Sequence, residues 1–145
     1  MKDEHFAFGR VLPDTWAFYD YVIGKEDDVD LKEIILKPIA FKIWVAEFSL
    51  KKKVWEVIGN IPLSDDLKRK IYFYKQDPIN NRVWKTITGE EELPVTVNEC
   101  LEFEVAAVWD PEHVAERLNY LFSGDNDPDL EYDKNLLLTK GISTK

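Results

Sequence analysis

The stretch FAFGRVLPDTWAFYDY, from Phe6 to Tyr21, holds six aromatic residues in sixteen positions. Two runs rich in aromatic and branched side chains flank Pro13-Asp14, a pair typical of turns. The pattern predicts a β-hairpin near the start of the chain. One arginine, Arg10, and one aspartate, Asp20, lie among these apolar residues.

The two charged residues of the hairpin admit two interpretations. Alternate side chains of a strand share a face, and several hairpin registers place Arg10 and Asp20 on the same side. The favoured interpretation is a half-buried ion pair that fixes the register, because a buried charge needs a partner. The other is an arginine at the floor of an aromatic pocket, where it could bind an anion.

The strongest helix signal lies near the end of the chain. Asp110 can cap a helix that begins at Pro111 and ends before Gly124. Val114 and Leu118 begin an apolar stripe along it. The preceding segment, Phe103–Trp109, is predicted to be one strand.

Together the elements predict an α+β fold. We expect a curved, mainly antiparallel β-sheet or a partly open barrel, with one C-terminal amphipathic helix and one or two short helices. The length of 145 residues favours one domain, placed over residues 1–124. Residues 125–145 are expected to be an acidic, then basic, loosely packed tail.

Charge is distributed unevenly. The net charge is −9, yet residues 90–133 contain fourteen acidic residues and a single basic one, Arg117. Such a field repels nucleic acid and attracts cationic partners. The alternative is a solvated acidic face that only keeps the protein soluble.

The residues that usually carry chemistry are few. Two histidines, His5 and His113, do not form any of the usual metal-binding spacings. Cys100 has no histidine nearby in sequence, and no glycine-rich phosphate loop occurs. We therefore predict no catalytic residue, no cofactor and no metal site.

Cellular location is inferred from what the sequence contains. A single cysteine fits a reducing cytoplasm. No apolar run approaches the roughly 18 residues of a membrane span, and the first residues lack a signal-peptide pattern. We expect a cytoplasmic protein without a membrane partner.

Five segments in order resemble the immunity protein 26 family of bacterial polymorphic toxin systems. They are FAFGRVL…AFYDY at 6–21, FKIWVA at 41–46, VIGNIPL at 57–63, FYKQDP at 73–78 and AAVWDPEHVAERL at 106–118. The resemblance implies a small cytoplasmic α+β protein that binds and neutralises a toxin encoded by an adjacent gene. It also matches recurrent family positions that we interpret as mainly structural. These positions are Gly9, Arg10, Tyr19, Asp20, Gln76, Asp77, Trp109 and Asp110.

The resemblance gives the acidic segment a further interpretation. Toxins of such systems are often nucleases with basic clefts, and carboxylates can occupy such a cleft in place of phosphate. The candidate partner-binding residues are Glu90, Glu91, Glu92, Asp125, Asp127, Asp129, Glu131 and Asp133.

Two alternatives to the immunity role stay open. Some relatives carry a phosphotriesterase label, which implies a small hydrolase of phosphotriesters or related esters. The aromatic face of the hairpin could instead bind a small molecule.

The start of the chain differs from the family pattern. Members generally begin with another strand, of the kind GDxFAIPL, whereas here only MKDEH precedes Phe6. Either the start codon is misplaced or a strand is missing, and in the second case the hairpin becomes a sheet edge.

Overall fold

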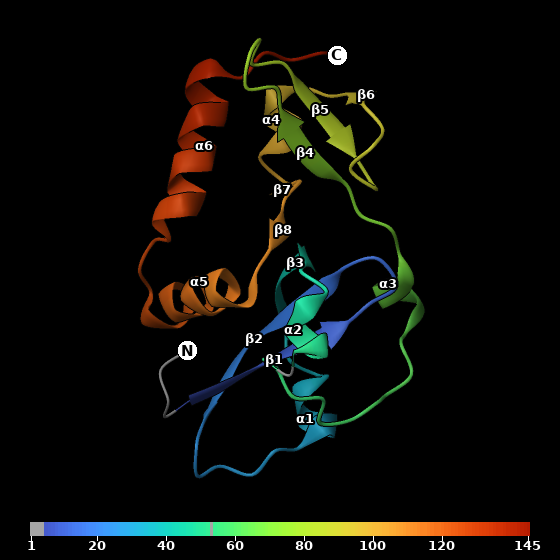
Figure 1. Cartoon of the computed structure of the whole chain (residues 1–145), viewed down its shortest axis with the longest axis vertical. Helices are drawn as coiled ribbons and strands as arrows, with labels where there is room; N and C mark the ends of the chain where they lie inside the picture. The colour runs from blue at the N-terminus through green and yellow to red at the C-terminus, as the bar shows by residue number, and fades with distance from the viewer. Residues whose placement is uncertain (1–4, 53) are drawn as a thin grey trace. The chain divides into compact units, whose positions relative to one another are not determined.

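A computed structural model describes residues 5–52 and 54–145 (Figure 1). They form two compact units. The first unit contains the described residues up to Arg69 together with Val108–Asp125, and the second contains Lys70–Ala107 and Asn126–Lys145. Each unit combines a four-stranded sheet with helices, which confirms the α+β class. The domain boundary at residue 124 stays a prediction, because compactness does not establish independent folding.

The sheet of the first unit begins with the predicted hairpin. Strands β1 (His5–Val11) and β2 (Trp16–Gly24) pair antiparallel. Strand β3 (Ile39–Val45) pairs antiparallel with β2, and β8 (Val108–Trp109) pairs parallel with β3. The order β1-β2-β3-β8 gives a curled, partly open sheet, with β1 at one edge among the described residues.

Helix α5 (Pro111–Ser123) covers this sheet and completes the first core. Val114 and Leu118 of α5 pack against Phe18, Phe41 and Ile43. The helix begins as predicted, since the Asp110 side chain accepts a hydrogen bond from the His113 amide at 3.1 Å. It ends at Gly124, whose φ of 78° suits glycine. Three further short helices belong to this unit: α1 (Leu31–Ile34), α2 (Phe48–Lys51) and α3 (Asp65–Lys68).

The predicted ion pair between Arg10 and Asp20 is wrong. An irregularity between Ala7 and Gly9 shifts the hairpin register and places Arg10 opposite Ala17. The Arg10 guanidinium instead donates two hydrogen bonds of 3.0 Å, to the carbonyl oxygens of residues 61 and 62. Asp20 is exposed. The arginine is therefore satisfied by backbone carbonyls.

The second unit is built on shorter strands. Strands β4 (Phe73–Gln76), β5 (Val83–Thr86), β6 (Leu93–Pro94) and β7 (Glu104–Val105) lie in the order β6-β5-β4-β7. The short helix α4 (Val97–Cys100) and the longer helix α6 (Pro128–Lys140) pack with them. Figure 1 shows α6 along one side of this sheet. The core residues are Tyr74, Val83, Val95, Cys100 and Leu137.

The prediction of one strand over Phe103–Trp109 is wrong. Its first part, β7, pairs with β4 in the second unit, and its last part, β8, pairs with β3 in the first. Ala106 donates its amide hydrogen to the Tyr74 carbonyl, whereas the Trp109 carbonyl accepts from Ala46. The apolar run thus contributes one strand to each of two sheets, and its composition does not indicate which strands it pairs with.

The last five residues, 141–145, are held by hydrogen bonds in the second unit. The Thr144 hydroxyl donates to the Val83 carbonyl at 2.7 Å and accepts from the Val95 amide at 2.9 Å. The Ile142 amide donates to the Asn81 carbonyl at 2.8 Å, and the Ser143 hydroxyl accepts from the Val97 amide at 2.9 Å. Residues predicted as a tail therefore form helix α6 and a segment bonded to the sheet.

Candidate partner-binding surface

The structure divides the acidic segment 90–133 between the two units. Ten of its fourteen acidic residues lie in the second unit, and four lie in the first. All the candidate partner-binding residues except Asp125 belong to the second unit. Their local environments separate those that stabilise the fold from those that present charge to solvent.

Glu91 organises the loop between β5 and β6. One of its carboxylate oxygens accepts hydrogen bonds from the Thr86 hydroxyl, from the Ile87 amide at 2.8 Å and from the Thr88 amide at 2.7 Å. The bonds from Thr86 and then Thr88 and Ile87 lower the pKa of the Glu91 carboxyl to about 2. Glu91 thus holds its own loop in shape, and its charge is already engaged there.

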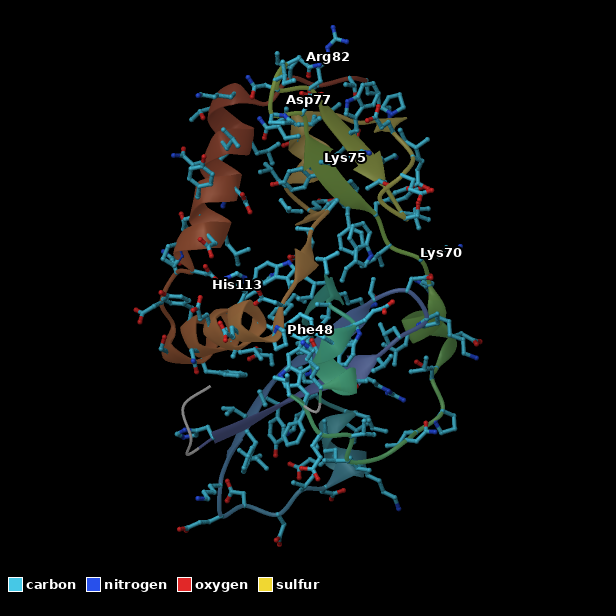
Figure 2. All side chains as sticks on the ribbon, in the orientation of Figure 1. Phe48, Lys70, Lys75, Asp77, Arg82 and His113 are labelled. Atoms are coloured by element: carbon cyan, nitrogen blue, oxygen red, sulfur yellow. The ribbon has the colours of Figure 1, made fainter. Side chains whose placement is uncertain are left out.

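The other two glutamates of this loop are more accessible. The carboxylate of Glu92 lies 3.6 Å from the ammonium of Lys75, which also donates to the Gly89 carbonyl at 3.2 Å. Figure 2 labels Lys75 on β4. Glu90 is exposed, and its side chain has no ion pair among the described residues. Exposed ion pairs contribute little, so Glu90 and Glu92 both remain available to a partner.

Asp125 and Asp127 make local contacts. Asp125 accepts a hydrogen bond from the Ser123 hydroxyl at 3.2 Å. Asp127 is buried and caps α6 by accepting from the Asp129 amide at 2.9 Å. Asp127 therefore starts the helix, and it does not present its charge to solvent.

The remaining candidates lie on the first two turns of α6. Asp129 and Glu131 are exposed, whereas Asp133 is half-buried. Burial, with smaller contributions from Asp129 and Asp127, raises the pKa of the Asp133 carboxyl above its ordinary value. The charge that α6 presents to solvent thus comes mainly from Asp129 and Glu131.

Sequence reasoning missed two apolar side chains on this helix. Tyr132 is 68% exposed and Leu138 is 54% exposed. Together with Pro128, Glu131, Lys134 and Asn135 they line an open hollow of about 360 Å³ on the helix surface. The missed signal is Asp127-Pro128, the same pair that predicts the start of α5 at Asp110-Pro111.

Four of the family-motif positions lie in the hairpin and make contacts inside the first unit. A Cβ at Gly9 would lie 2.8 Å from the Phe18 ring, so only glycine fits there without a shift. Tyr19 is buried, and its hydroxyl lies 3.5 Å from the Arg10 guanidinium that donates to it. The Asp20 amide donates to the Pro38 carbonyl at 2.8 Å.

The other four family-motif positions lie at the ends of two strands, at a turn and at a helix start. Gln76 donates to the Leu136 carbonyl at 3.4 Å. Asp77, labelled in Figure 2 at the β4–β5 turn, accepts from the Ile79 amide at 2.7 Å. Trp109 packs on the first core and Asp110 caps α5. Each contact is internal to one unit.

The described residues contain no group of three or more His, Cys, Asp or Glu side chains arranged to hold a metal ion. His113, which Figure 2 labels on α5, lies 3.2 Å from its capping residue Asp110. Cys100 is fully buried, and burial, followed by the charge of Glu99, raises the pKa of its thiol to about 11. Such a thiol is a poor nucleophile at neutral pH. The hydrolase alternative gains no support from these residues.

No described helix combines the length and the apolar character needed to cross a bilayer.

Comparison with known proteins finds a family match. Residues 1–85 match the model of a family described as Immunity protein 26. This range covers β1 to β4 and most of β5, and it ends before the acidic loop and α6. No curated protein and no solved structure matches the chain. The family description supports an immunity role, and a role of that kind indicates a binding protein more than an enzyme.

Proposed function

The chain belongs to the immunity protein 26 family, and we propose that it binds a cognate toxin and blocks its activity in the producing cell. The family match over residues 1–85 is the observation that carries this proposal. Neutralisation by binding requires no catalytic residue in the inhibitor. The protein then acts by stoichiometric association with its target.

The target is a nuclease in this proposal. Five exposed carboxylates among the candidates support it, those of Glu90, Glu92, Asp125, Asp129 and Glu131. A nuclease binds the phosphates of its substrate with lysine and arginine side chains. Carboxylates placed over such a cleft would exclude the nucleic acid and speed encounter with the toxin. The same charge disfavours nucleic acid as a direct partner of this chain.

The toxin is encoded by an adjacent gene and is met in the cytoplasm. We would express the C-terminal domain of the protein encoded directly upstream under tight control, with and without this chain, and follow growth. Growth arrest that this chain relieves, with the two proteins co-purifying one to one, is the expected result. An upstream domain that is harmless, or a growth arrest that this chain does not relieve, would contradict the immunity proposal. An assay of the purified protein on a phosphotriester, with and without divalent metal, would then test the hydrolase alternative.

The nuclease identity is tested separately. The purified toxin domain should degrade DNA or RNA in vitro, and an equimolar amount of this chain should stop the degradation. A toxin that arrests growth but leaves both nucleic acids intact would refute the nuclease part and leave the immunity role standing.

A further inference from the structure

Helix α6 has one face that holds it to the second unit. Leu137 is 1% exposed and packs in the core with Tyr74, Val83 and Val95. The Leu136 carbonyl accepts a hydrogen bond from Gln76 at 3.4 Å. These contacts anchor the helix and leave its opposite face outward.

The outward face combines apolar and acidic side chains. Tyr132 and Leu138 are exposed beside the open hollow, whose lining also includes Glu131, Lys134 and Asn135. Asp129 is exposed one turn before Asp133, at the start of the helix. A single exposed apolar residue is ordinary. A large tyrosine beside a hollow, with carboxylates around it, is the arrangement found where interfaces have an anchor and a charged rim.

The helix is also held in place at both ends. Asp127 caps its start, and the segment after it is fixed by the Thr144 hydrogen bonds to Val83 and Val95. A side chain on such a support loses little backbone freedom on binding, so more of its contact energy appears as affinity.

We infer that the outward face of α6, which we define as Pro128, Asp129, Glu131, Tyr132, Lys134, Asn135 and Leu138, is the surface on which the toxin docks. Tyr132 is the central anchor, and Asp129 with Glu131 meets basic side chains of the toxin. The inference rests on the proposed function and names the surface that performs it. Helix α6 lies outside the matched residues 1–85, so this surface is not part of the segment that identifies the family.

The occupant is a basic protein surface and not a second copy of this chain. A two-fold contact would bring Asp129 and Glu131 together from both partners, against a single lysine, Lys134, from each. Like charges brought together in this way oppose association. A cationic partner is attracted by the same residues.

The first test is the affinity of the purified upstream toxin domain for two matched variants. Tyr132→Ala should weaken binding by about 30-fold, the loss typical of an interface anchor. Ile79→Ala removes an even more exposed side chain, 91% exposed, from the β4–β5 turn of the same unit. That control should stay within about twofold of the unchanged protein. Equal affinities for all three proteins would overturn the inference.

A second pair of variants separates a local contact from the general field of the protein. Glu131→Lys and Glu102→Lys make the same change of charge at exposed positions of the second unit. Glu131→Lys should slow association about tenfold at low salt and make it less salt-dependent, and Glu102→Lys should change it much less. Equal effects of the two reversals would show a long-range field only, and would contradict docking on α6. If Tyr132→Ala lowers the melting temperature, this pair of charge reversals still tests docking on α6.

The failure of this inference is distinguishable from the failure of the proposed function. If the unchanged protein neither binds the toxin domain nor relieves growth arrest, the immunity role is rejected. If it does both and every α6 variant does so equally well, the role stands and the surface is wrong. A self-associated form that Tyr132→Ala abolishes, with unchanged toxin affinity, would mean that the face joins two copies, and would also overturn the inference.

Discussion

Helices α5 and α6 each contain thirteen residues, and each begins with an aspartate cap followed by proline. Helix α5 buries Val114 and Leu118 in the aromatic core of the first unit. Helix α6 buries only Leu137 among its apolar residues and leaves Tyr132 and Leu138 largely in solvent. The two helices thus have equal lengths and similar starts but bury different amounts of their apolar side chains. Apolar surface that folding does not use is available for binding, which is why α6 is the better candidate for a docking surface.

The largest effect should come from a matched pair of leucine truncations. Leu118→Ala in α5 removes a side chain that is 5% exposed and should lower the free energy of unfolding by about 2–5 kcal/mol. Leu138→Ala in α6 makes the same chemical change at a 54% exposed position, and should change it by less than about 0.5 kcal/mol. Urea denaturation of both variants measures the difference. Similar losses of free energy of unfolding would show that the outer face of α6 contributes to folding, and would contradict the difference drawn between the two helices.

A smaller loss is expected from the hydrogen bonds that fix the segment after α6. Thr144→Val keeps the shape but leaves the Val95 amide and the Val83 carbonyl without the hydroxyl. The expected destabilisation is about 1–3 kcal/mol. Thr139→Val is the control, because the Thr139 hydroxyl donates to the Asn135 carbonyl of its own helix at an exposed site. Equal melting temperatures for both variants would contradict a structural role of the last residues.

A still smaller effect on stability, with a defined dependence on pH, is expected from Asp133. Its carboxyl has a raised pKa in the folded protein, so folded-state stability falls as pH rises from the ordinary value of 3.8 through the raised pKa. Asp133→Asn removes this fall and should raise the melting temperature at pH 7, but not below the ordinary pKa. Glu131→Gln removes an exposed charge from the same helix and serves as the control. A stabilisation that persists at low pH would reject the titration of Asp133 as its cause.

The sequence predicted those parts of the fold that depend on local signals. Aromatic alternation around Pro13-Asp14 predicts the first hairpin, and the pair Asp110-Pro111 with Gly124 predicts both ends of α5. Asp127-Pro128 carries the same signal for α6. Helix α6 lacks the wide apolar stripe that accompanies this signal in α5, so the signal alone is weaker evidence for a helix there.

The parts that sequence could not predict depend on distant partners. The Arg10 guanidinium bonds to carbonyl groups about fifty residues away, which no local pattern reveals. Phe103–Trp109 has the composition of one strand but is shared between two sheets. The sequence does not distinguish the three consecutive glutamates from one another. In the structure, hydrogen bonds from Thr86 and Thr88 make Glu91 a structural residue, whereas Glu90 is exposed.

Amide hydrogen exchange of the protein alone and in complex with the toxin domain tests the contrast between the two helices most directly. If α6 is the docking surface, toxin binding should slow exchange across residues 128–140 and leave residues 111–123 unchanged. Slowed exchange confined to the first unit, with α6 exchanging as in the free protein, would contradict it.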